Sequence, residues 1–244
     1  MAVDIDIKQL LEAGAHFGHK TSRWHPKMKP YIHSWRGGVH IIDLAQTVTA
    51  LEKATAFISE VAAKDRQILF VGTKRQAQDI IKKAAADTNM PYVTERWFGG
   101  MLTNRATMEK RIRHLKDAEV KMDSGEYNTK YNKLEIQRFQ EEIDRMNLSF
   151  GGIKDMSGLP GAVFISDVLS DHIAVKEARR LKIPVIAIVD TNADPTNIDI
   201  PIPANDDAIK SLQLITDYIV KAIEEGRGKV KKVVADKEEV AEKV

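Results

Sequence analysis

Residues 67–77 read QILFVGTKRQA, and this stretch decides the fold class. The apolar run over 67–71 ends in a turn at Gly72, and the residues that follow carry apolar side chains at helical spacing over 73–87. The segment therefore predicts a buried strand, a turn and a helix.

The same pattern returns later in the chain. A strand is predicted over 160–166, a helix over 170–181 and a strand over 184–189. The remaining predicted elements are a strand at 39–42, a helix over 44–63, a short strand at 91–94 and a last helix over 206–224. Strands that are apolar throughout and alternate with helices predict a doubly wound, mostly parallel α/β sheet with Rossmann- or flavodoxin-like layers.

Composition narrows the classes of function. The 244 residues are 43% hydrophobic, and 37 Lys+Arg against 35 Asp+Glu leave a net charge of +2, so a nucleic-acid role needs local clustering of cations. The absence of cysteine excludes disulfide scaffolds and thiolate sites. No apolar run approaches the roughly 20 residues of a membrane helix. Asp4 and Asp6 stand where a secretory signal would carry basic residues. We expect a cytoplasmic protein with no membrane partner.

The segment 104–150 differs from the rest of the chain. It holds ten positive and nine negative residues and no strand-like run. Its apolar residues recur at spacings of three, four and seven on two arms, 108–122 and 136–146. We predict an inserted antiparallel coiled-coil hairpin that projects from the body. A helix pair packed flat on the body is the alternative.

These patterns divide the chain into three parts. Residues 1–103 and 151–226 form the predicted α/β domain, with a basic, aromatic loop over 13–42. Residues 104–150 form the hairpin. Residues 227–244 are highly charged without a useful apolar face, which predicts a disordered tail.

A parallel α/β sheet first suggests a nucleotide-binding enzyme, but the glycine pattern does not fit. The turn after the first buried strand has a single glycine, so neither G-x-G-x-x-G nor G-x-x-x-x-G-K-[ST] is present. Lys74 and Arg75 at the predicted helix start either hold one phosphate or are solvated residues. No catalytic triad can be nominated, and an orphan nucleotide- or sugar-phosphate-binding enzyme remains the alternative function.

Carboxylates gather where the parallel strands are expected to end. In a doubly wound sheet these strand ends line the crevice. His19, Asp190, Asp206 and Asp207 form a set that can hold a divalent ion. The same aspartates can instead cap helices. No other cofactor is expected.

The strongest signal lies in residues 13–42, which contain no acidic residue. Cations and aromatic rings alternate there, as in segments that contact RNA phosphates and bases. An aromatic cluster that seals the sheet edge is the alternative, and packing is the preferred role for the tryptophans. A second basic and aromatic segment spans 96–105. The predicted RNA-binding residues are Lys20, Arg23, Trp24, His25, Lys27, Lys29, Arg36, Lys74, Arg75, Arg96 and Arg105.

Four motifs resemble one known family. They are LLEAGAHFGH at 10–19, GTKRQA at 72–77, RWFGGMLTN at 96–104 and PGAVFISD at 160–167. Together they are similar to the bacterial small-subunit ribosomal protein S-two family, and the resemblance runs over about residues 3–225. The tail shows no such resemblance.

The resemblance implies a structural constituent of the small ribosomal subunit that works in translation and is not an enzyme. It implies binding to 16S-type rRNA through the hairpin and the basic edges, with no DNA partner. It also implies contact with other small-subunit proteins, notably the large mRNA-binding first protein. The apolar side of the body, with Phe17, is the candidate surface for that protein. A coiled-coil adaptor that oligomerises through the hairpin is a further alternative.

Overall fold

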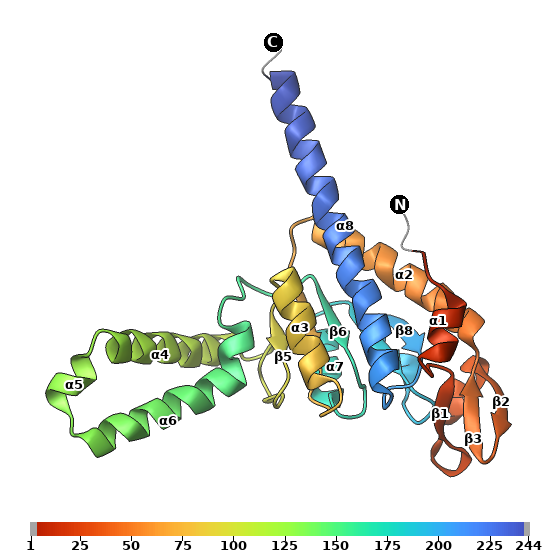
Figure 1. The fold of residues 1–244 in the computed structure, drawn as a ribbon, viewed down its shortest axis with the longest axis horizontal. Helices are drawn as coiled ribbons and strands as arrows, with labels where there is room; N and C mark the ends of the chain where they lie inside the picture. The colour runs from red at the N-terminus through yellow and green to blue at the C-terminus, as the bar shows by residue number, and fades with distance from the viewer. Residues whose placement is uncertain (1–3, 242–244) are drawn as a thin grey trace.

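The computed structural model describes residues 4–241. A five-stranded sheet with the order β5-β4-β6-β7-β8 forms its centre (Figure 1), and every neighbouring pair of strands is parallel. The strands are β4 (Ile68–Val71), β5 (Tyr92–Val93), β6 (Ala162–Ile165), β7 (Val185–Val189) and β8 (Ile200–Pro203). The predicted α/β fold class is confirmed.

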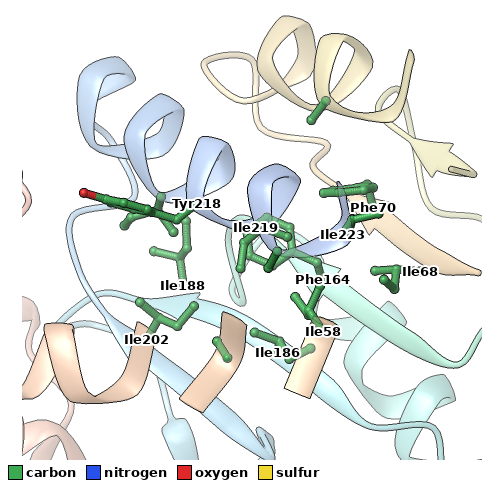
Figure 2. Close-up of a cluster of buried hydrophobic side chains, with 14 of the residues drawn as sticks. Ile58, Ile68, Phe70, Phe164, Ile186, Ile188, Ile202, Tyr218, Ile219 and Ile223 are labelled. Atoms are coloured by element: carbon green, nitrogen blue, oxygen red, sulfur yellow. The ribbon is translucent and has the colours of Figure 1, made fainter. Parts of the chain in front are cut away.

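Helices cover both faces of this sheet. On one face lie α2 (Leu44–Ala63), α3 (Gln78–Thr88) and α8 (Ile209–Ala241), and on the other lies α7 (His172–Arg180). Figure 2 shows Phe70 and Phe164 of the sheet packed with Ile219 and neighbouring side chains of the first face. The next residue along β4, Val71, belongs to the second face. β4, β6 and β7 are buried at every position because successive side chains enter opposite cores.

The edge strand β8 was not predicted. It reads IPIP, and proline lacks the N–H that a central strand needs. At the edge, β8 pairs only with β7, and Ile202 still enters the core. The prolines argued against a strand in the sequence, but a strand at the edge of a sheet tolerates them.

Residues 13–42 do not form the predicted extended loop. Three short strands of this segment build an antiparallel sheet with the order β1-β3-β2, which follows α1 (Ile7–Glu12). The strands are β1 (Phe17–Lys20), β2 (Ile32–Arg36) and β3 (Val39–Ile42). Gly37 and Gly38 have φ values of 59° and 77°, as a tight two-residue hairpin turn requires. The prolines lie in the short helical segment Pro26–Tyr31, outside the strands.

The segment after β5 forms the predicted helical hairpin. Helices α4 (Arg105–Asp123) and α6 (Lys133–Phe150) lie side by side and project from the body rather than packing flat on it (Figure 1). A short helix, α5 (Glu126–Lys130), occupies the predicted turn. Asn132 and Glu135 form a reciprocal capping box at the start of α6. A short helical turn, Gly151–Ile153, leads back to the body.

The last helix, α8, differs from the expected one at both ends. It begins at Ile209 and continues to Ala241, where the sequence predicted a disordered tail from 227. The tail lacks proline and contains five Lys and three Glu, which are good helix formers. Residues 242–244 of that predicted tail lie outside the described residues.

Two glycines of α8 provide a matched test of helix packing. A Cβ at Gly226 would overlap the carbonyl oxygen of Ser59 and lie 2.8 Å from Ala62 Cβ on α2, whereas a Cβ at Gly228 meets nothing within 4 Å. We expect Gly226→Ala to lower the free energy of unfolding by about 1–3 kcal/mol through overpacking. Gly228→Ala should raise it by about 0.5–1 kcal/mol through helix propensity. Urea denaturation measures both, and stabilisation by both variants would contradict the close approach of α8 to α2.

Candidate functional site

A buried ion cluster occupies the crevice at the carboxyl ends of the parallel strands. Lys74 follows β4, and its Nζ lies 2.8 Å from carboxylate oxygens of both Asp206 and Asp207. Asp167, which follows β6, lies 3.7 Å from the same Nζ. Burial opposes the charge of Lys74, but hydrogen bonds to Asp206 and Asp207 outweigh it and raise the pKa of Lys74. The crevice thus contains a cation supplied by the chain itself.

Burial acts in the opposite sense on the carboxyl group of Asp206. It raises the pKa of Asp206 to about 7, and the charges of Asp167 and Asp190 add to this effect while Lys74 opposes it. Lys74 therefore offsets part of the cost of burying several carboxylates in one place.

His19 connects the antiparallel sheet to this cluster. Its Nδ1 lies 3.2 Å from Asp190 Oδ2, and its Nε2 lies 3.2 Å from Asp207 Oδ2. The hydrogen bond to Asp190 raises the pKa of His19 against the opposing effect of burial. The backbone N–H of His19 also donates to Thr191 Oγ1 over 2.8 Å. The end of β1 is therefore held against the end of β7.

The structure brings the four predicted metal ligands together. Ligand atoms of His19, Asp206 and Asp207 lie within 4.8 Å of one another. Asp190 contacts His19 and accepts a hydrogen bond from the backbone N–H of Thr191 at 2.5 Å. A divalent ion at these ligands would share Asp206 and Asp207 with the ammonium of Lys74. The metal site therefore stays a prediction.

The turn after β4 is already filled by a carboxylate of the chain. Asp171, at the start of α7, accepts hydrogen bonds from the backbone N–H and the hydroxyl of Thr73 over 3.2 and 2.9 Å. The helix predicted from residue 73 begins only at Gln78, because residues 74–77 form a turn. The proposed helix start at Lys74 was wrong, and the N–H group that could hold a nucleotide phosphate is occupied.

The buried carboxyl group of Asp171 should make the free energy of unfolding depend on pH. Burial raises its pKa to about 6, against the two hydrogen bonds from Thr73. The folded state therefore binds this proton more tightly than the unfolded state, whose pKa is 3.8, so the contribution of Asp171 to stability grows as pH falls. We expect the difference in unfolding free energy between the wild type and Asp171→Asn to shift by about 2 kcal/mol in favour of the wild type from pH 7 to pH 4.

Denaturation at a series of pH values measures this shift, because subtraction of the variant removes the contributions of other groups. A difference that stays constant with pH would show that Asp171 titrates normally.

A second buried carboxylate organises the segment that leads into the hairpin. Glu177 of α7 accepts five hydrogen bonds, two of them from the Trp97 indole N–H and the Thr103 hydroxyl. The other three come from the backbone N–H groups of Gly100, Leu102 and Thr103, over 2.6 to 3.0 Å. Burial alone would raise the pKa of Glu177, but these N–H donors outweigh it and lower the pKa. The loop is thus wrapped around one carboxylate.

Replacement of this carboxylate should loosen the base of the hairpin. Glu177→Gln puts an amide N–H₂ group among N–H donors, so we expect a loss of about 2–4 kcal/mol in unfolding free energy. Faster hydrogen exchange should be confined to residues 97–104 and the start of α4. Glu142→Gln, at an exposed position of α6, is the matched control and should change stability by less than about 0.5 kcal/mol. Unchanged exchange in residues 97–104 would contradict this role of Glu177.

The predicted RNA-binding cations of residues 13–42 lie on or beside the antiparallel sheet. Only Lys27 makes an ion pair among the described residues, with Asp194 at 3.0 Å. His25 is half-buried, and its Nδ1 accepts from the backbone N–H of Lys27. Trp24 is half-buried with its ring 5.3 Å from that of His40, as the packing role predicts for this residue. The other predicted cations of residues 13–42, namely Lys20, Arg23, Lys29 and Arg36, are exposed and have no ion-pair partner among the side chains that the structure describes.

The remaining predicted cations fall into two places. Lys74 is enclosed by the carboxylates of the crevice, so it is not presented to a phosphate, whereas the neighbouring Arg75 is exposed. Arg96 is exposed and lies over the Phe98 ring, 5.9 Å from its centroid. Arg105 pairs with Glu109 at 2.5 Å. The structure therefore separates the basic surface of residues 13–42 from the base of the hairpin.

The buried carboxylates Asp171 and Glu177 were not predicted from the sequence, although the sequence around Glu177 contains a signal for it. Glu177 lies three residues after Ala174 and next to Ala178, on the buried face of α7. An acidic residue on an apolar helical face predicts a satisfied buried carboxylate. Asp171 left no comparable signal, because its partner Thr73 is 98 residues away.

The crevice and the basic surface together define a class of protein. The strand-end crevice is filled by Lys74 and Asp171, while unpaired cations lie outside it on a separate small sheet. This arrangement is that of an α/β binding protein rather than a nucleotide-using enzyme. No helix in the described part of the chain is both long and apolar enough to cross a membrane.

Comparison with known proteins gives the family. Residues 10–226 match the family model of ribosomal protein S2. A small ribosomal subunit protein uS2 of Roseiflexus sp. (strain RS-1) is 50% identical over 232 residues, which cover 95% of this chain and 88% of the relative. Its counterpart in Chloroflexus aggregans is 50% identical over 222 residues, 91% of this chain and 93% of the relative. That of Mycobacteroides abscessus is 49% identical over 226 residues, 93% of this chain and 81% of the relative.

The chain belongs to the ribosomal protein S2 family. It is a structural, non-enzymatic protein of the small ribosomal subunit. The predicted family and the predicted absence of enzymatic activity are confirmed by these matches.

Proposed function

We propose that the protein binds 16S-type rRNA through the exposed cations of its antiparallel sheet and through the hairpin and its base. The observation that carries this proposal is the set of four unpaired cations, Lys20, Arg23, Lys29 and Arg36, in a segment without any acidic residue. A cation without an internal partner gains most from a phosphate, because no ion pair has to be broken first. Such contacts position the protein on rRNA and do not require it to read bases.

The hairpin and its base support the proposal in a different way. Arg96 is exposed on the loop that Glu177 fixes, so its position relative to the body is set before any RNA binds. Residues 104–150, which form the hairpin, carry ten cations, and the hairpin projects away from the sheet (Figure 1). A projecting arm with mixed charge reaches an RNA surface that the flat face of the body cannot.

The proposal includes a second role, which is to support docking of the large mRNA-binding first protein. Ile7 and Leu11 are one turn apart on α1 and are 46% and 53% exposed, and Phe17 on β1 is 49% exposed. An apolar surface of this kind fits a protein partner better than a polyanion. It lies on the same N-terminal part of the chain as the basic surface, as a protein that joins rRNA to another protein requires.

Neutralising the four unpaired cations tests the rRNA contact. We expect Lys20, Arg23, Lys29 and Arg36 changed together to Gln to weaken binding to a 16S-type rRNA transcript and to flatten the dependence of log K on log salt by about 2–3 units. The physical reason is that each phosphate contact releases counterions when it forms, so a variant with fewer contacts releases fewer counterions on binding. Filter binding at several salt concentrations measures the slope.

A charge-matched control replaces Lys53, Lys64, Lys82 and Lys83 on α2 and α3 by Gln. The control removes the same net charge from the body and should leave the slope nearly unchanged. Equal flattening by both variants would show that the net charge, and not this surface, determines binding.

A further inference from the structure

Trp35 is the most exposed large apolar side chain in the described part of the chain, at 72%. The other two tryptophans are used inside the protein. Trp97 is 6% exposed and donates to Glu177, and Trp24 packs beside His40. An indole has a large apolar surface that is normally buried, so one left in water points to a partner that covers it.

Trp35 lies beside the turn of the β-hairpin formed by β2 and β3. It is the last residue but one of β2, and its register partner on β3 is His40. The turn that follows consists of Gly37 and Gly38, and a Cβ at either glycine would meet nothing within 4 Å. The tip is therefore accessible to a large partner, and the paired strands hold the indole in place before binding.

Cations surround this tip. Arg36 and Lys20 are both register partners of Val39, one from each neighbouring strand. The backbone N–H of Thr21 donates to the carbonyl oxygen of Gly38 over 2.9 Å, which keeps the Thr21–Arg23 turn beside the tip. We call the surface formed by Lys20, Arg23, Trp35 and Arg36 the basic tip.

The chemistry of the basic tip selects the partner. An apolar protein surface would cover the indole but would leave three cations without counter-charges. A nucleic-acid strand supplies both flat rings for the indole and phosphates for the cations. Adjacent residues of a strand point to opposite faces, so Trp35 and Arg36 flank the tip on two sides and a strand that crosses it meets both.

We infer that the indole of Trp35 stacks on an unpaired base of the small-subunit rRNA, while the cations of the basic tip contact neighbouring phosphates. This inference rests on the proposed rRNA binding and adds to it a defined aromatic contact. Stacking on a base is tolerant of sequence, because every base has a π-face. The contact therefore selects a single-stranded or bulged site rather than a particular base.

Three substitutions of Trp35 test the stacking contact. We expect Trp35→Ala to weaken binding to a 16S-type rRNA transcript about 5- to 100-fold, the range of one aromatic–base stack. Trp35→Phe should retain most of the affinity, and Trp35→Leu should lose as much as Trp35→Ala. The salt slope should stay that of the wild type in all three, because stacking releases no counterions. Thermal unfolding controls for folding, which an exposed position should hardly affect.

Photo-cross-linking locates the partner. In purified small subunits that contain the protein, ultraviolet irradiation followed by mass spectrometry should find Trp35 joined to an rRNA nucleotide. A Trp35 cross-link to a ribosomal protein would overturn the inference in favour of a protein contact. If the Trp35→Leu variant binds as tightly as the Trp35→Phe variant, the stacking inference is overturned in favour of simple apolar burial.

The failure of this inference can be told apart from the failure of the proposed function. If Trp35→Ala binds like the wild type while the four-cation variant flattens the salt slope, stacking is wrong and rRNA binding by the basic surface stands. If neither variant changes binding, both proposals fail.

Discussion

The ion pairs of the Lys74 ammonium group are the interactions on which the arrangement of the two sheets and the last helix depends. This group reaches carboxylates at the ends of β6 and before α8, and through Asp207 it is connected to His19 of the antiparallel sheet. Without a cation there, Asp206 would be left among like charges, although its pKa is already raised, first by burial and then by the charges of Asp167 and Asp190. The parallel sheet, the last helix and the small sheet are thus held at one point, and the position of the basic surface relative to the body follows from it.

The same cluster explains how a fold that often binds nucleotides serves another purpose here. In doubly wound sheets a ligand lies beyond the carboxyl ends of the strands. In this chain Lys74 pairs with the carboxylates of Asp167 and Asp206 in the crevice, and Asp171 accepts the hydrogen bonds of Thr73, so both groups join elements of the chain itself. The proposed rRNA contacts lie outside this crevice, on a small sheet at one side of the body and on a helical hairpin at the other (Figure 1).

The sequence predicted well those features that depend on local periodicity. The helix over 44–63 and the strands at 68–71 and 185–189 follow directly from apolar spacing, and so do the two arms of the hairpin. Features that depend on distant partners were missed. β8 was hidden by its prolines, because only its edge position makes them acceptable. The ion pairs of Lys74 and the bonds of Asp171 join residues about a hundred positions apart, and no local pattern reports such contacts. The predicted metal ligands do lie together in the structure. Lys74 lies beside them, whereas the sequence had suggested that Lys74 contacts a phosphate.

The prolines of β8 have a further consequence for a protein that must exist before its subunit is assembled. An exposed sheet edge is a template on which another chain can add a strand. Pro201 and Pro203 offer no N–H donor at this edge, and the carbonyl oxygen of Pro203 is already bonded to the hydroxyl of Thr47. The opposite edge, β5, is only two residues long. Neither edge of the five-stranded sheet offers a long row of free donors, so strand addition by another copy is disfavoured at this sheet before the subunit is assembled.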